Sequence, residues 1–287
     1  MGISAIDGMM FGAKSMSASQ LPSQGSLIGV RISVTNYAEV TRCVIEAARA
    51  RRRLLVAACN VHSVMEARSD PAFAAVLNAF DITTPDGQPL RWGLRWNGQA
   101  TLRERVYGPT LMLEVCREAA AAGQSIYFYG SRPDTVAALS RRLSGQFPNL
   151  GIAGARGGRF RPLTEDEMHG DAARILDSGA GIVFVGMGCP RQEWWMFHMR
   201  DRIERPMLGV GAAFDFHAGR VEQAPGVLQD RGLEWLFRLS REPRRLWRRY
   251  LVVSPQYLPL ITAQALGLRE FSLETDLAEA RTRNCPG

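Results

Sequence analysis

The sequence predicts an α/β protein with a mostly parallel sheet and a basic, helical appendage near its C-terminal end. From Ser26 onward, short apolar runs alternate with helical patterns of about ten residues or more, which implies crossover connections between parallel strands. Three of the runs, Leu54–Cys59, Ile126–Tyr129 and Ile182–Val185, are continuously apolar. Such strands are typical of a sheet that helices cover on both faces.

The expected elements follow one another in a regular order. The expected strands are Leu27–Val34, Leu54–Cys59, Asp81–Thr83, Ser125–Tyr129, Gly181–Val185 and Met207–Val210. The expected helices are Tyr37–Ala50, Pro71–Ala79, Thr110–Ala122, Pro133–Leu143 and Arg191–Arg200. Ligands of such sheets bind beyond the carboxyl ends of the strands. We therefore expect the site in the segments that follow strands: Asn60, Pro85–Gly87, Gly130–Arg132, Gly186–Gln192 and Gly211–His217.

These patterns divide the chain into a flexible leader (residues 1–25), a core (26–219), a basic helical appendage (220–268) and a tail (269–287). Residues 231–249 hold seven arginines and two acids, and Pro243 is expected to begin a new helix there. A charge run is ordinarily a solvated face, but this excess favours a polyanionic partner, either phosphates of a lipid or nucleic acid. Residues 251–268 carry no charge but contain two prolines, which indicates an interfacial anchor. No apolar run is long enough to predict a transmembrane helix.

The composition excludes some kinds of chemistry. Of 35 basic residues only Lys14 is a lysine, so a phosphate must be held by guanidinium groups or backbone amides. The five cysteines form no CxxC pair, which predicts buried thiols in a reducing compartment, although Cys189 lies inside a motif and is left open. The four histidines are too dispersed to suggest a site, and we expect no metal.

The turn Thr84–Gly87 places the carboxyl group of Asp86 directly after an expected strand. A general base is useful at that edge of a sheet. Pro-Asp-Gly is also favoured composition for an ordinary turn, so two interpretations stand: Asp86 is a catalytic base, or it is only a turn residue.

Two further strand-to-loop transitions carry candidate binding residues. Residues 186–193 open a helix whose first N–H groups are suited to phosphate, and Arg191 and Gln192 add side-chain donors. The glycine pattern ending at Gly188 does not complete a dinucleotide fingerprint. After the last strand, Asp215 is placed either to accept hydrogen bonds from ribose hydroxyls or to cap the turn, with Phe214 and Phe216 in the core.

Together these motifs resemble the WecG/TagA/CpsF glycosyltransferases. The resemblance runs in order from about Leu54 to Tyr250. It rests on Asn60, the Thr84–Gly87 turn, Gly186–Glu193, Gly209–Phe216, Ala224-Pro225, and the distinctive Gly232–Leu239 and Glu242–Arg245 blocks.

The resemblance implies a Rossmann-like core and an inverting transfer from a UDP-sugar, without a metal or other cofactor. The acceptor would be an undecaprenyl-diphosphate-linked saccharide of cell-surface polysaccharide synthesis, at the cytoplasmic face of the membrane. By position, Asp86 matches the family's base, and the other matching residues are Asn60, Gln192, Asp215, Arg238, Arg245 and Arg248. Ala58 and Arg159 depart from what many relatives carry near the donor. The transferred hexose therefore stays open between glucose and N-acetylmannosamine types.

Two other classes of protein remain as alternatives. A nicotinamide-dependent oxidoreductase would share the sheet but should show the complete glycine fingerprint, which is absent. A nucleic-acid-binding protein would explain the arginines but not the loops at residues 85–87 and 190–193.

Overall fold

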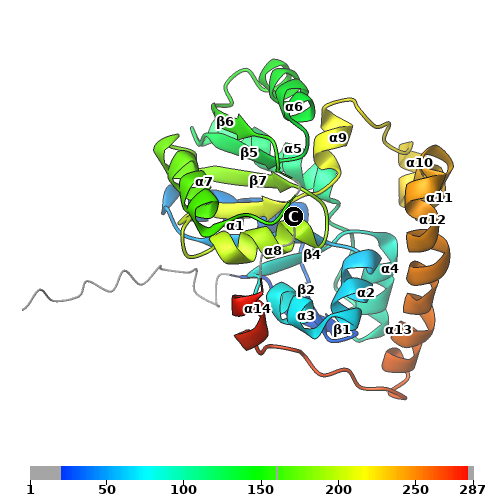
Figure 1. Ribbon diagram of the computed structural model, residues 1–287. Helices are drawn as coiled ribbons and strands as arrows, with labels where there is room; N and C mark the ends of the chain where they lie inside the picture. The colour runs from blue at the N-terminus through cyan, green and yellow to red at the C-terminus, as the bar shows by residue number, and fades with distance from the viewer. Residues whose placement is uncertain (1–20, 160, 284–287) are drawn as a thin grey trace, which may run out of the picture.

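The computed structural model describes residues 21–159 and 161–283. Most of the expected leader, residues 1–25, lies outside the described residues. The centre of the fold is a six-stranded sheet in which every pair of neighbouring strands is parallel (Figure 1). In spatial order the strands are β4 (Ile82–Pro85), β3 (Leu54–Cys59), β8 (Pro206–Gly209), β7 (Ile182–Gly186), β5 (Ile126–Gly130) and β6 (Ile152–Arg156). The predicted α/β fold with a parallel sheet is confirmed.

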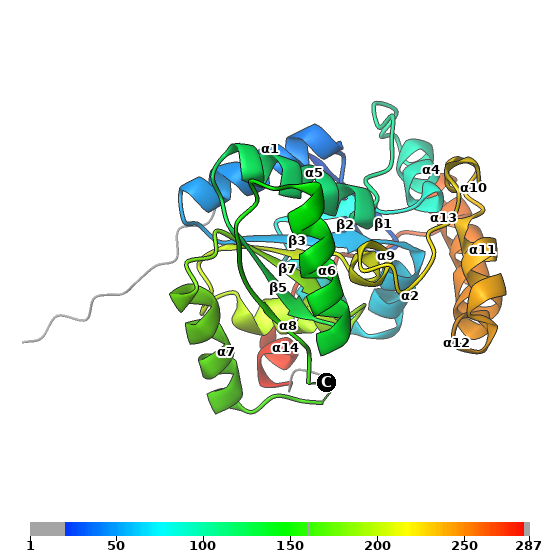
Figure 2. The same cartoon turned by 90° about the horizontal axis from the view of Figure 1, so that it is seen from above.

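Helices cover both faces of this sheet, as the continuously apolar strands predict (Figure 2). Successive side chains of a strand point to opposite faces, so Leu54 and Val56 enter one core cluster while Leu55 and Ala57 enter the other. The first face carries α1 (Tyr37–Arg49), α5 (Gly108–Ala121), α6 (Pro133–Gln146) and α9 (Ala213–His217). The second face carries α2 (Val61–Ser69), α3 (Pro71–Asn78), α7 (Glu165–Asp177) and α8 (Arg191–Met199).

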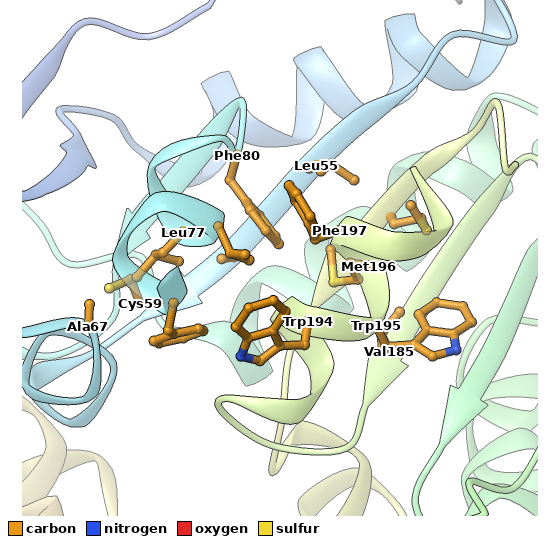
Figure 3. Close-up of a cluster of buried hydrophobic side chains, with 14 of the residues drawn as sticks. Leu55, Cys59, Ala67, Leu77, Phe80, Val185, Trp194, Trp195, Met196 and Phe197 are labelled. Carbon is orange, nitrogen blue, oxygen red and sulfur yellow. The ribbon is translucent and has the colours of Figure 1, made fainter. Parts of the chain in front are cut away.

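Aromatic side chains of α8 dominate the core on the second face. Figure 3 shows Trp194 and Phe197 projecting from this helix toward Leu77 of α3 and Phe80, which follows α3. Trp195 stacks on Tyr129 of β5, with the two ring centroids 4.0 Å apart. This packing fixes the start of α8 relative to the strand ends on which the candidate site depends.

The predicted single strand Leu27–Val34 is wrong. The chain instead forms a hairpin of β1 (Gln24–Leu27) and β2 (Val30–Ser33), which pair antiparallel in a separate two-stranded sheet. Gly29 allows the turn because its φ is 79°, a conformation that costs glycine little. The other expected strands and helices form within three residues of their predicted bounds. The edge strand β6 and the helices α2 and α4 (Gln88–Trp96) were not anticipated.

The C-terminal segment forms a column along one side of the molecule, seen in both views. It contains α10 (Gly226–Asp230), α11 (Glu234–Arg241), α12 (Pro243–Trp247), the π-helix η2 (Arg248–Val253), the 3₁₀-helix η3 (Ser254–Gln256) and α13 (Tyr257–Ala265). Pro243 does begin a helix, as predicted. After α13 the chain returns to α14 (Ala278–Thr282), which packs on α3. In the described part of the chain, no helix is both long and apolar enough to cross a bilayer.

The last helix of this column, α13, is anchored in the core beside α4. Tyr257 and Ile261 are fully buried, and the side chain of Gln264 donates to the carbonyl of Ser26 and accepts from the amide of Ile28, both at 2.8 Å. Gly93 lets the two helices approach, because a Cβ there would lie 2.4 Å from the Tyr257 hydroxyl. The boundaries at residues 219 and 268 stay predictions.

We predict that Gly93→Val destabilises the protein by about 1–3 kcal/mol, the usual range for an overpacked core. The matched control is Gly170→Val on α7, where an added Cβ meets nothing within 4 Å. Thermal unfolding followed by circular dichroism should show a lower Tm for the first variant and an almost unchanged Tm for the second. Equal Tm values would contradict the close packing of α13 on α4.

Candidate active site

The parallel sheet brings the predicted strand-end loops to one edge. Residues Asn60, Asp86, Ser131, Gly188 and Gly211 follow β3, β4, β5, β7 and β8, respectively. Because all these strands run in the same direction, their carboxyl ends share that edge. The fold therefore brings these segments to the same edge of the sheet, as the sequence predicts.

Asp86 is held tightly in the turn after β4. Its amide donates to the carbonyl of Cys59 at the end of the neighbouring strand, at 2.7 Å. Its Oδ2 atom accepts from the amide of Gly108, the first residue of α5, at 3.3 Å. A Cβ at Gly108 would lie 3.0 Å from the Cβ of Ala58, so a glycine lets the helix start approach the carboxyl group. Asp86 as a whole residue is half-buried, and its carboxyl group is the buried part.

The surroundings of Asp86 raise its pKa to about 7. Burial is the largest cause, and the negative charge of Glu234 adds to it. The positive charges of Arg105 and Arg238 and the hydrogen bond from Gly108 act in the opposite direction. A carboxyl group with such a pKa is suited to accept a proton near neutral pH.

A network of side chains joins this region to the C-terminal segment. The Tyr107 hydroxyl donates to Oε1 of Glu234 at 2.8 Å, and Nη1 of Arg105 contacts Oε2 of Glu234 at 3.3 Å. Nη2 of Arg105 donates to Oε1 of Gln229 at 2.8 Å. Sequence reasoning missed Arg105 and Tyr107, because they lie in a loop without a motif. It quoted Glu234 within a motif but gave it no role.

Asn60 is the N-cap of α2 and also contacts the C-terminal segment. Its Oδ1 atom accepts from the amide of His62 at 3.0 Å and from Nη2 of Arg249 at 3.1 Å. Arg249 was not among the predicted site residues. The predicted residue beside it, Arg248, is exposed to solvent.

Gln192 is 3% exposed and ties two strand-end loops together. Its Oε1 atom accepts from the amides of Gly188 and Gly211, at 3.2 and 3.0 Å, and its Nε2 donates to Glu193 at 2.8 Å. Burial raises the pKa of Glu193 to about 7 and also raises the pKa of the Cys189 thiol. The polar atoms of the Gln192 side chain therefore contact two backbone amides and the Glu193 carboxyl group. A direct role of Gln192 on a sugar stays a prediction.

Asp215 lies on α9 and faces the arginines of the C-terminal segment. Burial raises the pKa of its carboxyl group, while the charges of Arg245 and Arg238 lower it. The turn after α9 is closed by the backbone carbonyl of Asp215, which accepts from the amide of Arg220 at 2.9 Å. A backbone hydrogen bond thus closes this turn, and the Asp215 side chain is not required for it.

The remaining predicted binding residues lie around the same edge. Arg238 places its guanidinium over the Phe216 ring, 5.6 Å from the centroid, and Arg245 pairs with Glu242 at 2.9 Å. Arg191 opens α8 and is partly exposed. Open space adjoins Gly188, since a Cβ there would meet nothing within 4 Å.

Three of the histidines have structural surroundings. Burial lowers the pKa of His62, His198 and His217, and His217 contacts the carbonyl of Pro109 at 2.9 Å. Within residues 21–159 and 161–283, no three His, Cys, Asp or Glu side chains gather as a metal site would require. That the reaction needs no metal stays an expectation.

The raised pKa of Asp86 predicts a dependence of stability on pH. An unfolded Asp loses its proton near pH 4, whereas folded Asp86 keeps it to about pH 7, so the wild-type protein loses stability from Asp86 as the pH rises between these values. We expect Asp86→Asn to raise Tm relative to wild type, by a margin that grows from pH 4 to pH 7 and is constant above. A margin that is independent of pH would contradict the burial of this carboxyl group.

The comparison with known families agrees with this geometry. The chain matches the description "Glycosyl transferase WecG/TagA/CpsF family" over residues 25–270, which is most of its length. The matched range includes every strand of the parallel sheet, Asp86 and the arginine-rich helices. The chain therefore belongs to the WecG/TagA/CpsF family and is a glycosyltransferase of cell-surface polysaccharide synthesis.

Proposed function

We propose that this enzyme transfers a hexose from a UDP-sugar to an undecaprenyl-diphosphate-linked saccharide, with inversion and without a metal or other cofactor. The observation that carries the proposal is Asp86. This half-buried residue at the strand-end edge has a carboxyl group with a pKa of about 7, next to guanidinium groups of the C-terminal segment. This pairing suits a reaction that needs a base and releases a diphosphate.

The ends of β5 and β7 support a nucleotide site. The helices that follow these strands, α6 and α8, lie on opposite faces of the sheet, so the two loops diverge at a topological switch point. Glycines line this point, and a Cβ at Gly130 would lie 3.0 Å from the carbonyl carbon of Gly186. Backbone amides can approach a phosphate closely there. In the proposal the UDP moiety occupies this point, where Asp215 accepts hydrogen bonds from ribose hydroxyls.

The spacing between strands suits a donor that lies along this edge. Three strand intervals, about 14 Å in total, separate β4 from β7. A nucleotide sugar of that reach would extend from the glycine-lined point toward Asp86. Arg191, Arg238, Arg245 and Arg248 then supply positive charge for the departing diphosphate.

The proposed step is a single displacement. The acceptor hydroxyl loses its proton to Asp86, and its oxygen attacks the anomeric carbon from the face opposite UDP. The new glycosidic bond forms as the bond from the anomeric carbon to the phosphate oxygen breaks, and UDP leaves with the electron pair. General-base assistance of this kind contributes roughly 10²–10⁴-fold to the rate. Asn60 and Gln192 would orient the sugar and the acceptor.

The surface of the C-terminal segment supports a membrane-bound acceptor. In the described part of the chain, all exposed large apolar side chains lie on α4 or beyond residue 226; they are Trp92, Trp96, Val227, Leu233, Trp235, Leu236, Trp247, Leu251, Val252, Leu258, Leu266, Leu268 and Leu273. Exposed arginines, among them Arg231 and Arg244, lie on the same segment. Apolar anchors together with guanidinium groups are the chemistry that binds an anionic bilayer. We infer a peripheral enzyme on the inner face of the cell membrane.

We predict that Asp86→Asn lowers kcat by at least about 100-fold, the lower limit for loss of a general base, while UDP binding is kept. The wild-type kcat/KM should rise with pH up to about pH 7, because only ionised Asp86 accepts the proton. The assay uses a panel of UDP-sugars with a synthetic lipid-diphosphate monosaccharide, and calorimetric titrations with UDP, NAD and duplex DNA separate the proposal from its alternatives. Near-normal turnover by Asp86→Asn would refute the assignment.

We predict that Trp247→Ser combined with Leu251→Ser weakens binding to phosphatidylglycerol vesicles by about tenfold or more, because two apolar anchors are lost. Transfer to a short-chain, water-soluble acceptor should be unchanged. Sedimentation with vesicles measures the binding. Comparison with neutral phosphatidylcholine vesicles gives the contribution of electrostatic attraction to that binding. Leu273→Ser removes an exposed leucine outside α10–α13 and is the matched control; an equal loss with this variant would argue against the proposed surface.

A further inference from the structure

Glu234 contacts residues beside Asp86, and the transfer step described above gives it no role. We propose that Glu234 is a positioning residue for the transfer step, because it fixes the C-terminal segment against the loop before α5 and completes the charge environment of Asp86. This inference rests on the function proposed above. Glu234 touches neither donor nor acceptor in this scheme and acts through its neighbours.

Both carboxylate oxygens of Glu234 are engaged by one loop. Oε1 accepts from the Tyr107 hydroxyl and Oε2 pairs with Arg105. The pair is largely shielded from water, with side chains 14% exposed for Glu234 and 12% for Arg105. Removal of one partner from such a shielded pair costs far more than the loss of an exposed ion pair, so these contacts define one position for the segment.

The same contacts fix two helices of the segment. Glu234 is the first residue of α11, and Arg238 follows it by one helical turn, so the position of the carboxylate sets the position of the Arg238 guanidinium. Arg105 also donates to Gln229 on α10, whose side-chain Nε2 donates to the carbonyl of Ala224 at 2.7 Å. Arg105 therefore links α10 and α11 to the loop that leads into α5.

Glu234 also changes the electrostatic balance at Asp86. The titratable or charged groups that act on Asp86, or on which Asp86 acts, come from every element around it: Tyr37 on α1, Cys59 on β3, Arg105 and Tyr107 before α5, Glu234 and Arg238 on α11, and Arg249 on η2. Glu234 is the carboxylate in this set, against three guanidinium groups. It offsets Arg105 directly, and without it the arginines would keep Asp86 ionised but weakly basic.

The test is the pH profile of Glu234→Gln in the full-length enzyme. The change removes the negative charge and releases Arg105, and both effects favour ionised Asp86. We expect the acidic limb of kcat/KM to move to lower pH by about one unit or more, as for the loss of a close charge. We also expect kcat above pH 8 to fall, because the base is weaker, and KM for the donor to rise, because Arg238 is less well placed.

Two control variants separate this role from a structural one. Arg105→Gln removes positive charge beside Asp86 and should move the acidic limb to higher pH, the opposite direction. Glu222→Gln makes the same charge change as Glu234→Gln at an exposed ion pair with Arg241 and should leave the limb in place. If Glu234→Gln does not yield folded protein, Glu234→Asp keeps the charge but shortens the side chain: a raised KM for the donor supports the positioning role, and a KM equal to that of wild type contradicts it.

The inference and the proposed function fail in different ways. An active wild-type enzyme whose acidic limb stays fixed in Glu234→Gln and Arg105→Gln, with activity lowered by one factor at every pH, would overturn the inference alone. A wild-type enzyme that transfers no sugar from any UDP donor would overturn the proposed function instead.

Discussion

The candidate site depends on the parallel pairing of β3 with β4. In this register Cys59 lies beside Pro85, so the residues that follow them, Asn60 and Asp86, emerge next to each other. The amide of Asp86 donates to the carbonyl of Cys59 and continues the ladder past the end of the strands. Backbone hydrogen bonds alone thus bring the side-chain amide of Asn60 and the carboxyl group of Asp86 to neighbouring positions.

The buried position of Asp86 is destabilising when its carboxyl group is ionised, and packing elsewhere in the fold offsets this. Burial of a carboxyl group disfavours its ionised form, and here it is the largest cause of the raised pKa of Asp86. The apolar faces of the sheet and the aromatic layer of α8 stabilise the scaffold independently of the site. The polar network of Glu234, Arg105 and Tyr107 then supplies fixed partners at the one edge where the apolar core ends.

The parts of the site that the sequence predicted are those that local pattern determines. Apolar runs locate the strand ends, and so Asn60, Asp86 and Gly188 could be assigned to one edge. Contacts between distant segments have no such signal, which is why Arg105 and Tyr107 were missed. Arg249 was missed for the same reason, since its contact with Asn60 joins segments 189 residues apart, and the role of the neighbouring Arg248 stays a prediction.

The C-terminal segment joins two surfaces with different tasks in the proposed function. Glu234, Arg238 and Arg249 contact the strand-end side, whereas Trp235, Leu236 and Trp247 are exposed to solvent. Because α11 carries residues of both kinds within one turn, it cannot leave the core without also separating Glu234 from Arg105 and Tyr107. In the proposed function, a bilayer that held the outer residues would therefore act on the same helix that sets the charge beside Asp86. Membrane binding and the position of Glu234 beside Asp86 would then be coupled in this proposal, so that each stabilises the other.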